Sequence, residues 1–167
     1  MKKFIVLMFL LLSIGAYSQE LKIAYVNAGE VFNIMPEITD AETKMATIRK
    51  QYEDTLKAMT DEHTLKYQEY MKIEATLPEN LKLKKQQEIM ELQDRYQNYL
   101  PVADQEIQQE QEKIYAPIQE KLMNAIKAVG DDQKYTAIFA NNPNIVYYVG
   151  ATAIDATPLV KAKLGLK

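Results

Sequence analysis

Apolar residues in the middle of this chain recur at helical spacing, whereas those near its two ends form short runs typical of strands. The middle region extends from Gly29 to Gly130 without another glycine. Proline is tolerated in the first turn of a helix but breaks its interior, and glycine is favoured just after the last turn. Pro36 therefore marks the start of a helical region, Pro78 an interruption near its middle and Gly130 its end.

We predict two long helices in this region, residues 36–76 and 79–129, with a tip at residues 77–80. A connection this short places the helices antiparallel. Because a helix rises 1.5 Å per residue, roughly forty residues extend about 60 Å, more than the diameter of a small domain. The hairpin must therefore project as an arm.

A single apolar stripe on each helix predicts the seam of this arm. Members of the first stripe repeat at eleven-residue steps, as Met45, Leu56 and Tyr67 do, and this repeat favours a nearly straight or slightly right-handed pairing. One stripe per helix joins the two helices and leaves little apolar surface for a thick core. The first stripe comprises Ala41, Met45, Ile48, Tyr52, Leu56, Met59, His63, Tyr67 and Tyr70; the second comprises Ile89, Leu92, Tyr96, Leu100, Ala103, Ile107, Ile114, Ile118, Leu122 and Val129.

Two prolines lie inside the second predicted helix. Pro101 and Pro117 each lack a backbone N–H and crowd the carbonyl four residues earlier, so each is expected to bend or divide the helix. An alternative is that the helix ends at Leu100 and a separate helix follows. In either case we expect the arm to flex at these two prolines.

The residues before the arm predict a strand followed by a short helix. Residues 21–27 are apolar on both faces, which is typical of a buried strand. Asn27 and Glu30 form a capping box, so a short helix is expected over residues 28–35. At the other end of the chain, Asp155 or Thr157 is the expected cap of a second short helix that ends at Gly165.

Between the arm and the last helix we predict a β-hairpin. Its strands are residues 135–140 and 145–149, and its turn is residues 141–144, which hold three asparagines and a proline. The run 146–149 is apolar at every position, which implies burial on both faces. Three short strands in one chain cannot bury it, so we infer that other copies of the chain complete the body.

Residues 1–18 have the pattern of a signal peptide, in which two lysines precede an apolar run and small residues stand at Ala16 and Ser18. We predict cleavage after Ser18 and export, with no membrane span because the apolar run is too short. Removal lowers the formal net charge from −3 to −5, because these residues carry two lysines and no acid. An acidic chain argues against nucleic-acid binding. The sequence also has no cysteine for disulfides.

Lysines gather near the predicted tip, at Lys66, Lys72, Lys82, Lys84 and Lys85. A solvated helix surface is the plain interpretation. The alternative is a transient contact between this Lys-rich tip and an anionic membrane surface or an acidic partner. Apolar residues off the stripe in the same part of the arm are the candidates for contact with a bound partner: Leu65, Met71, Ile73, Leu77, Leu81 and Leu83.

No residue pattern predicts catalysis. His63 is the only histidine and stands on the predicted stripe, so it supports neither an acid–base cluster with Asp61 and Glu62 nor a di-iron site, which needs repeated Glu-x-x-His pairs. The chain has no glycine-rich phosphate loop and no cysteine for zinc. We therefore expect no catalytic residue, no metal and no cofactor, and we predict that the protein is not an enzyme.

The order of these parts resembles the Skp (OmpH-like) family of periplasmic chaperones. The resemblance covers the chain from about residue 21 to its end. It is carried by residues 22–27 with Val31 and Phe32, by Pro117 and Ile118 with Ala125 and Ile126, and by residues 145–149, 155–157, Val160, Leu164 and Gly165.

The resemblance implies an α+β, jellyfish-like homotrimer. In it, residues 19–35 and 130–167 would form a small β body and residues 36–129 the arm. The three arms would enclose unfolded outer-membrane proteins without using nucleotide. This chain is acidic whereas enterobacterial relatives are basic, so lipopolysaccharide binding does not carry over and client capture shifts toward apolar contacts. The implied oligomer interface comprises Ile23, Tyr25, Val26, Ile145, Val146, Tyr147, Tyr148 and Val149.

Two hypotheses about function follow. The first is an ATP-independent holdase that surrounds an unfolded client. The alternative is a structural or adaptor coiled-coil protein of the cell envelope that bridges folded partners.

Overall fold

The computed structural model describes residues 21–142 and 146–166. The predicted signal peptide, its cleavage site after Ser18, and Ile145 lie outside these residues. The elements follow in the order β1 (Ile23–Val26), α2 (Ala28–Asn33), α3 (Pro36–Ile73), η1 (Glu74–Thr76), α4 (Glu79–Gln133), β2 (Ala137–Ala140), β3 (Ile154–Asp155) and α5 (Thr157–Lys163).

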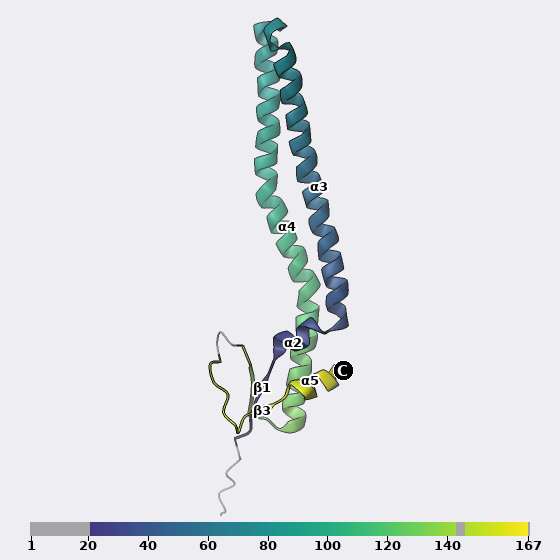
Figure 1. Cartoon of the computed structure of the whole chain (residues 1–167), viewed down its shortest axis with the longest axis vertical. Helices are drawn as coiled ribbons and strands as arrows, with labels where there is room; N and C mark the ends of the chain where they lie inside the picture. The colour runs from purple at the N-terminus through teal and green to yellow at the C-terminus, as the bar shows by residue number, and fades with distance from the viewer. Residues whose placement is uncertain (1–20, 143–145, 167) are drawn as a thin grey trace, which may run out of the picture.

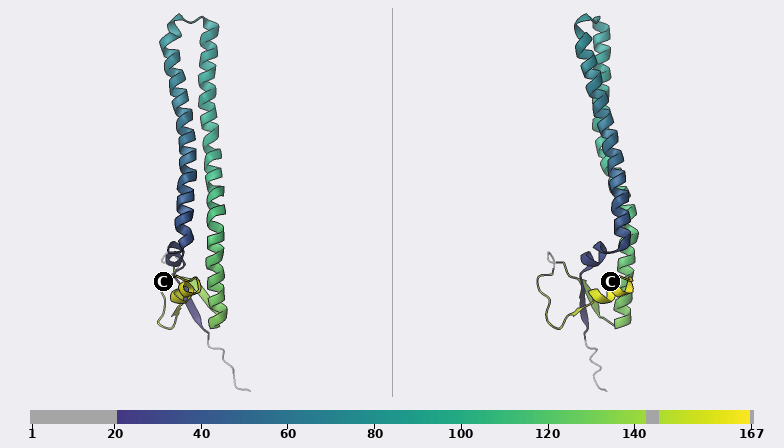
Figure 2. Two further views of the ribbon diagram at one scale, coloured as in Figure 1. Left: turned by 90° about the vertical axis from the view of Figure 1, so that its right-hand side faces the viewer. Right: turned by 45° about the vertical axis from the view of Figure 1, so that its right-hand side comes forward.

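Helices α3 and α4 form a long antiparallel hairpin that projects from a small body (Figure 1). Pro36 occupies the first turn of α3, where its missing N–H costs nothing. At the tip, Leu77 has an extended backbone, and the carbonyl of Pro78 accepts the first backbone hydrogen bonds of α4. The left view of Figure 2 shows the two helices side by side along the arm. The two predicted helices and their tip are therefore present.

Helix α4 is longer and less interrupted than predicted. It runs continuously through Pro101 and Pro117, so the alternative in which the helix ends at Leu100 is wrong. Each proline removes one backbone donor, and the hydrogen bonds of the neighbouring turns keep the helix intact. The helix also continues past Gly130, which we expected to close it. It ends instead at Lys134, whose backbone is left-handed with φ 56°.

The arm is thin because few side chains are buried between its helices. Beyond the base of the arm, the buried side chains among the described residues are Met45, Tyr70, Leu92 and Ala103. Tyr67, predicted in the seam, is 49% exposed. The position before it, Lys66, is partly buried, so the seam passes through residue 66 and not through residue 67 at this level. The other stripe residues of this part of the arm are partly exposed.

The body is built on a three-stranded parallel sheet in the order β2-β1-β3. Strand β1 pairs with β2 from Ile23 opposite Ala137 to Val26 opposite Ala140. The short strand β3 lies at the other edge, where Ile154 is opposite Ala24. The two ends of the chain therefore meet in one sheet, and the arm is inserted between them.

The prediction of a β-hairpin formed by residues 135–140 and 145–149 is wrong. Strand β2 pairs with β1 in parallel, and residues 146–149 are irregular in the described chain. Residues 146–149 instead border the sheet face opposite the core, beside Ile23 and Tyr25. A parallel pair needs a long crossover connection, and the arm supplies it between β1 and β2.

One apolar core joins the body to the base of the arm. It packs one face of β1 against α2, α5, the first turns of α3 and the last turns of α4. Burial of these side chains from water is the main stabilising contribution to this part of the molecule. The buried residues are Ala24, Val26, Val31, Met35, Ile38, Ala41, Ile118, Leu122, Ala125, Val129, Ala156 and Val160.

Hydrogen bonds around Asn27 connect the two ends of the chain. The side-chain oxygen of Asn27 accepts the backbone N–H of Glu30 at 3.2 Å, so Asn27 caps α2 as predicted. The Glu30 carboxylate accepts from the side-chain amide of Asn27 and not from its backbone N–H. Only one of the two hydrogen bonds of the predicted capping box is therefore present. The backbone N–H of Asn27 donates instead to the hydroxyl of Thr157 at 2.9 Å. Asp155 in turn accepts the backbone N–H of Thr157 at 2.9 Å at the start of α5.

Candidate functional site

The face of the sheet opposite the core is open. Side chains alternate along a strand, so Ala24 and Val26 enter the core whereas Ile23 and Tyr25 lie on the other face. Phe139 is the register partner of Tyr25 and is exposed on that face. We call Ile23, Tyr25 and Phe139 the open sheet face.

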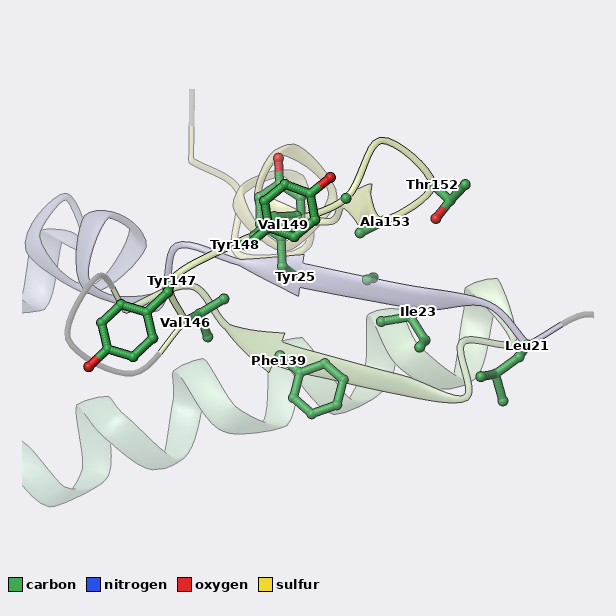
Figure 3. A pocket seen from close by; sticks show the side chains of 12 residues that line it. Leu21, Ile23, Tyr25, Phe139, Val146, Tyr147, Tyr148, Val149, Thr152 and Ala153 are labelled. Atoms are coloured by element: carbon green, nitrogen blue, oxygen red, sulfur yellow. The ribbon is translucent and has the colours of Figure 1, made fainter.

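Residues 146–149 border the open sheet face. Together they line a groove of about 550 Å³ (Figure 3). Tyr147 and Tyr148 are 90% and 84% exposed. Large exposed apolar patches of this kind mark interaction sites in soluble proteins.

The structure brings most of the predicted interface residues together at this groove: Ile23, Tyr25, Val146, Tyr147, Tyr148 and Val149. Val26 is the exception. It is 2% exposed inside the core, because its side chain lies on the same face of β1 as that of Ala24.

Phe139 was missed by the sequence analysis. Its position depends on the register between β1 and β2, two strands far apart in sequence, and no local pattern reveals that register.

Near the tip, the arm leaves the predicted client-contact residues largely uncovered. Leu77 is partly buried where η1 ends. The others are exposed: Leu65, Met71, Ile73, Leu81 and Leu83.

A groove of about 440 Å³ crosses from α3 to α4 in this part of the arm. Buried Tyr70 and partly buried Ile89 line its base, and exposed Tyr67, Met71 and Met90 line its rim. The lining is completed toward the tip by Glu74 and Gln86. We call this site the Met–Tyr groove. Met90 was missed by the sequence analysis, although its spacing from the predicted stripe residue Ile89 places it off the seam.

The opposite face of the arm at this level is charged. Lys66 pairs with Glu69 at 3.6 Å, and Lys85 pairs with Glu88 at 3.0 Å. The bond from Lys85 lowers the pKa of Glu88. These residues line a smaller cavity of about 70 Å³ on the other side of Tyr70. The Met–Tyr groove is therefore mostly apolar, whereas the smaller cavity holds two ion pairs beside exposed Ile73.

Three of the five lysines of the Lys-rich tip lie in ion pairs with glutamates of their own helix. Two of these pairs are those of Lys66 and Lys85, and the third joins Lys82 to Glu79 at 3.9 Å. Within the described chain, Lys72 and Lys84 make no ion pair. Exposed pairs of this type contribute little to stability.

Two tyrosines connect the helices of the arm through hydrogen bonds. The hydroxyl of Tyr70 donates to Glu74 at 3.0 Å and accepts from the side-chain amide of Gln86 at 2.8 Å. Burial raises the pKa of Tyr70, and the bond to Glu74 raises it further. Nearer the body, the hydroxyl of Tyr52 donates to Glu106 at 2.8 Å, and this bond raises the pKa of Tyr52.

His63 is partly buried on the seam, where the helical spacing placed it. Among residues 21–142 and 146–166, the structure holds no cluster of three or more histidine, aspartate or glutamate side chains arranged to bind a metal ion. The helices in these same ranges lack any stretch both long enough and apolar enough to cross a membrane.

Comparison with known proteins relates these surfaces to a family. Residues 22–164 match the family described as Outer membrane protein (OmpH-like). The crystal structure of a candidate outer membrane chaperone (OmpH-like) from Caulobacter crescentus is similar in fold, with a TM-score of 0.72 and 14% sequence identity. The similarity covers 85% of this chain and 82% of that chain. No curated protein matches the sequence.

Proposed function

Because the chain belongs to the OmpH-like family, we propose that it is an ATP-independent holdase chaperone of the periplasm. In this role it binds unfolded outer-membrane proteins and prevents their aggregation. The observation that carries the proposal is the set of large apolar side chains left uncovered on a projecting arm. Soluble monomers rarely expose so many apolar side chains together unless these bind something.

The proposed assembly is a homotrimer joined through the open sheet face and residues 146–149. Tyr147 and Tyr148 would then be covered by other copies of the chain. The outer edge of β2 also has no strand partner among the described residues, and such edges are normally covered in native proteins. Val26 is not part of this proposed interface, because it is already buried in its own chain.

Client capture in this proposal is multivalent. Each of three arms contributes weak apolar contacts from the exposed residues near its tip, and the contacts add up to a stable yet releasable complex. The arms would surround the client in the cavity between them, and flexing at Pro101 and Pro117 would let the cavity adapt to clients of different size.

Contact of the Lys-rich tip with an anionic membrane is a further, weaker part of the proposal. A lysine near an anionic membrane surface contributes about 1 kcal/mol. Three of the five lysines are already paired with glutamates, which leaves Lys72 and Lys84 as the main contributors. The contact would therefore be transient.

Light scattering tests the proposal directly. The molar mass of residues 19–167 is measured alone and after an unfolded outer-membrane β-barrel protein is diluted into the sample. We expect a trimer that takes up one client in a soluble complex. A monomer or dimer that leaves the client to aggregate would contradict the proposal and favour the adaptor alternative, which predicts a stable folded partner.

A matched pair of variants tests the arm. Replacing Leu65, Met71 and Ile73 by aspartate should abolish the suppression of aggregation, because the apolar contacts are lost. The control adds the same charge at three exposed polar positions of α4, Gln93→Asp, Gln97→Asp and Asn98→Asp. Equal loss of activity in both triple variants would show that charge alone, and not the apolar contact, is responsible.

A further inference from the structure

The Met–Tyr groove has a composition that points to one kind of client segment. We propose that it binds an aromatic side chain of an extended, unfolded polypeptide at a place where a basic residue is next to that aromatic residue. This inference rests on the proposed holdase function and deepens it, because it names the segments that the arm selects.

The preference for an aromatic side chain follows from the rim. Met71 of α3 and Met90 of α4 lie on the two helices that border the groove, 52% and 59% exposed. Methionine is flexible, and its sulfur makes favourable contacts with aromatic rings. Tyr67 adds an aromatic ring to the same rim, which can pair edge-to-face with an incoming ring.

The shape of the groove favours a side chain over a folded partner. Its volume of about 440 Å³ falls within the range of sites that take small molecules, roughly 300–1,000 Å³, and is far too small for a folded domain. Both walls are helices, whose backbone groups are bonded within each helix, so the groove offers no edge for an added strand. Recognition therefore depends on the inserted side chain.

The preference for a neighbouring basic residue follows from charge. Glu74 is the one acidic or basic residue among those that line the groove. One of its oxygens accepts from Tyr70, and the other has no hydrogen-bond partner among the described residues. Glu79 at the start of α4 also contributes to the raised pKa of Tyr70, but its carboxylate is paired with Lys82 at 3.9 Å, so Glu74 supplies the unpaired negative charge at the groove. The nearby lysines Lys66 and Lys85 line the opposite face, paired with glutamates.

The same charge argues against a second copy of the chain as the occupant. A second arm placed groove to groove would bring its own Glu74 against the first, and like charges at close range repel. A positively charged unfolded segment experiences the opposite effect. The groove is therefore assigned to the client and not to the oligomer.

Methyl NMR of the protein labelled at its methionines tests this assignment. Three unstructured ten-residue peptides are compared, identical except for a central Phe-Lys, Phe-Glu or Ala-Lys pair. We expect the Met71 and Met90 methyl signals to shift with the Phe-Lys peptide and the Phe-Glu peptide to bind roughly two- to fivefold more weakly, the effect of an exposed charge pair. The Ala-Lys peptide should cause no shift. Met123, 62% exposed but distant along α4, is the internal control and should not respond.

Variants separate the two parts of the proposal. Met71→Gln together with Met90→Gln should abolish Phe-Lys binding, whereas Met123→Gln should leave it unchanged. Glu74→Gln keeps an oxygen that accepts from Tyr70 and removes the charge, so it should bind Phe-Lys and Phe-Glu equally. The inference is overturned if Met123 shifts as much as Met71 and Met90, if wild type shows no Phe-Lys preference, or if the double variant still binds.

An aggregation assay with an unfolded outer-membrane protein distinguishes this failure from failure of the proposed function. If the protein suppresses aggregation but its groove methyls do not respond to any peptide, the groove assignment is wrong and the holdase function stands. If the protein does not suppress aggregation, the holdase function is wrong. Selective shifts at Met71 and Met90 would then still establish the groove as a peptide site.

Discussion

The body and the arm of this protein are held together by different amounts of buried surface. In the body, apolar side chains from five elements pack into a single core that also includes the base of the arm. Along the rest of the arm, buried side chains are few and well separated. The comparison shows where the fold is fixed by a shared core and where it depends on local helix contacts.

This difference fits the proposed roles of the two regions, in which the body forms the assembly and the arm binds the client. A core shared by β1, α2, α5 and both long helices fixes the base of the arm to the body. An arm with little interior keeps methionine, tyrosine and leucine side chains on its surface, where they are available to a client. Elements that must adapt to a partner are generally drawn from the less stable parts of a structure.

The largest expected effect comes from breaking the body core. Met35 is 2% exposed, so Met35→Ala should cost about 2–5 kcal/mol of the free energy of unfolding. The measurement is urea unfolding at fixed protein concentration. Met123→Ala, at an exposed site, should change stability by no more than about 0.5 kcal/mol. Equal losses of unfolding free energy in the two variants would mean that the buried core of the body contributes no more to stability than an exposed site does.

Strengthening the arm should have a smaller effect of opposite sign. Pro101→Ala restores a backbone donor inside α4 and should stabilise the arm by about 1–3 kcal/mol. Hydrogen exchange should then slow in the arm while the amides of the body sheet keep their rates. Pro158→Ala, in the first turn of α5, is the control and should give no such gain. Unchanged exchange around residue 101 would show that the proline does not weaken the arm.

Removing one hydroxyl near the tip should weaken the arm locally. Tyr70→Phe deletes the bonds to Glu74 and Gln86 and should cost about 0.5–1.5 kcal/mol. We expect faster hydrogen exchange near the tip and no change in the body. Tyr67→Phe, at an exposed site on the same helix, serves as the comparison. An effect that spreads to the body amides would mean that arm and body unfold as one unit.

The smallest expected effect concerns the ion pair between Glu37 at the start of α3 and Lys121 of α4. The hydrogen bond from Lys121 lowers the pKa of Glu37 below its ordinary value of 4.5. A lowered carboxylate pKa stabilises the folded state above the unfolded-state pKa, and this contribution is lost as pH falls through the lowered value.

At pH 7, Glu37→Gln should therefore cost less than about 1 kcal/mol, because both side chains are partly exposed. The difference in urea midpoint between wild type and variant should shrink once the pH falls below 4.5. Glu42→Gln, at an exposed site on the same helix, is the matched control for the loss of one glutamate charge. A difference that grows at low pH would contradict the assigned role of Lys121.

The arm was predictable from sequence because its determinants are local. Pro36, Pro78 and the apolar spacing fix where each helix starts and which side chains can meet. Gly130 was misleading, because a glycine near the end of a helix favours termination but does not require it, and Lys134 took the left-handed position instead.

The sheet was less predictable because its pairing is not local. The turn residues after β2 and the apolar run 146–149 have the composition of a hairpin, yet β2 pairs with β1 from the other end of the chain. The register of that pair places Phe139 on the open sheet face and Val26 in the core. Residues of a strand that is apolar on both faces cannot be assigned to one face without that register.

The parallel sheet also sets the order in which the molecule becomes complete as it is synthesised. Strand β1 is made before the arm, whereas its partners at residues 137–140 and 154–155 are made after it. The arm needs only contacts between neighbouring helices and can close before those residues exist. The growing chain therefore carries an unpaired β1 until the arm has been made, and the sheet of the body forms after the arm. In the proposed assembly, copies can associate through a complete open sheet face only after β2 has been made in each chain.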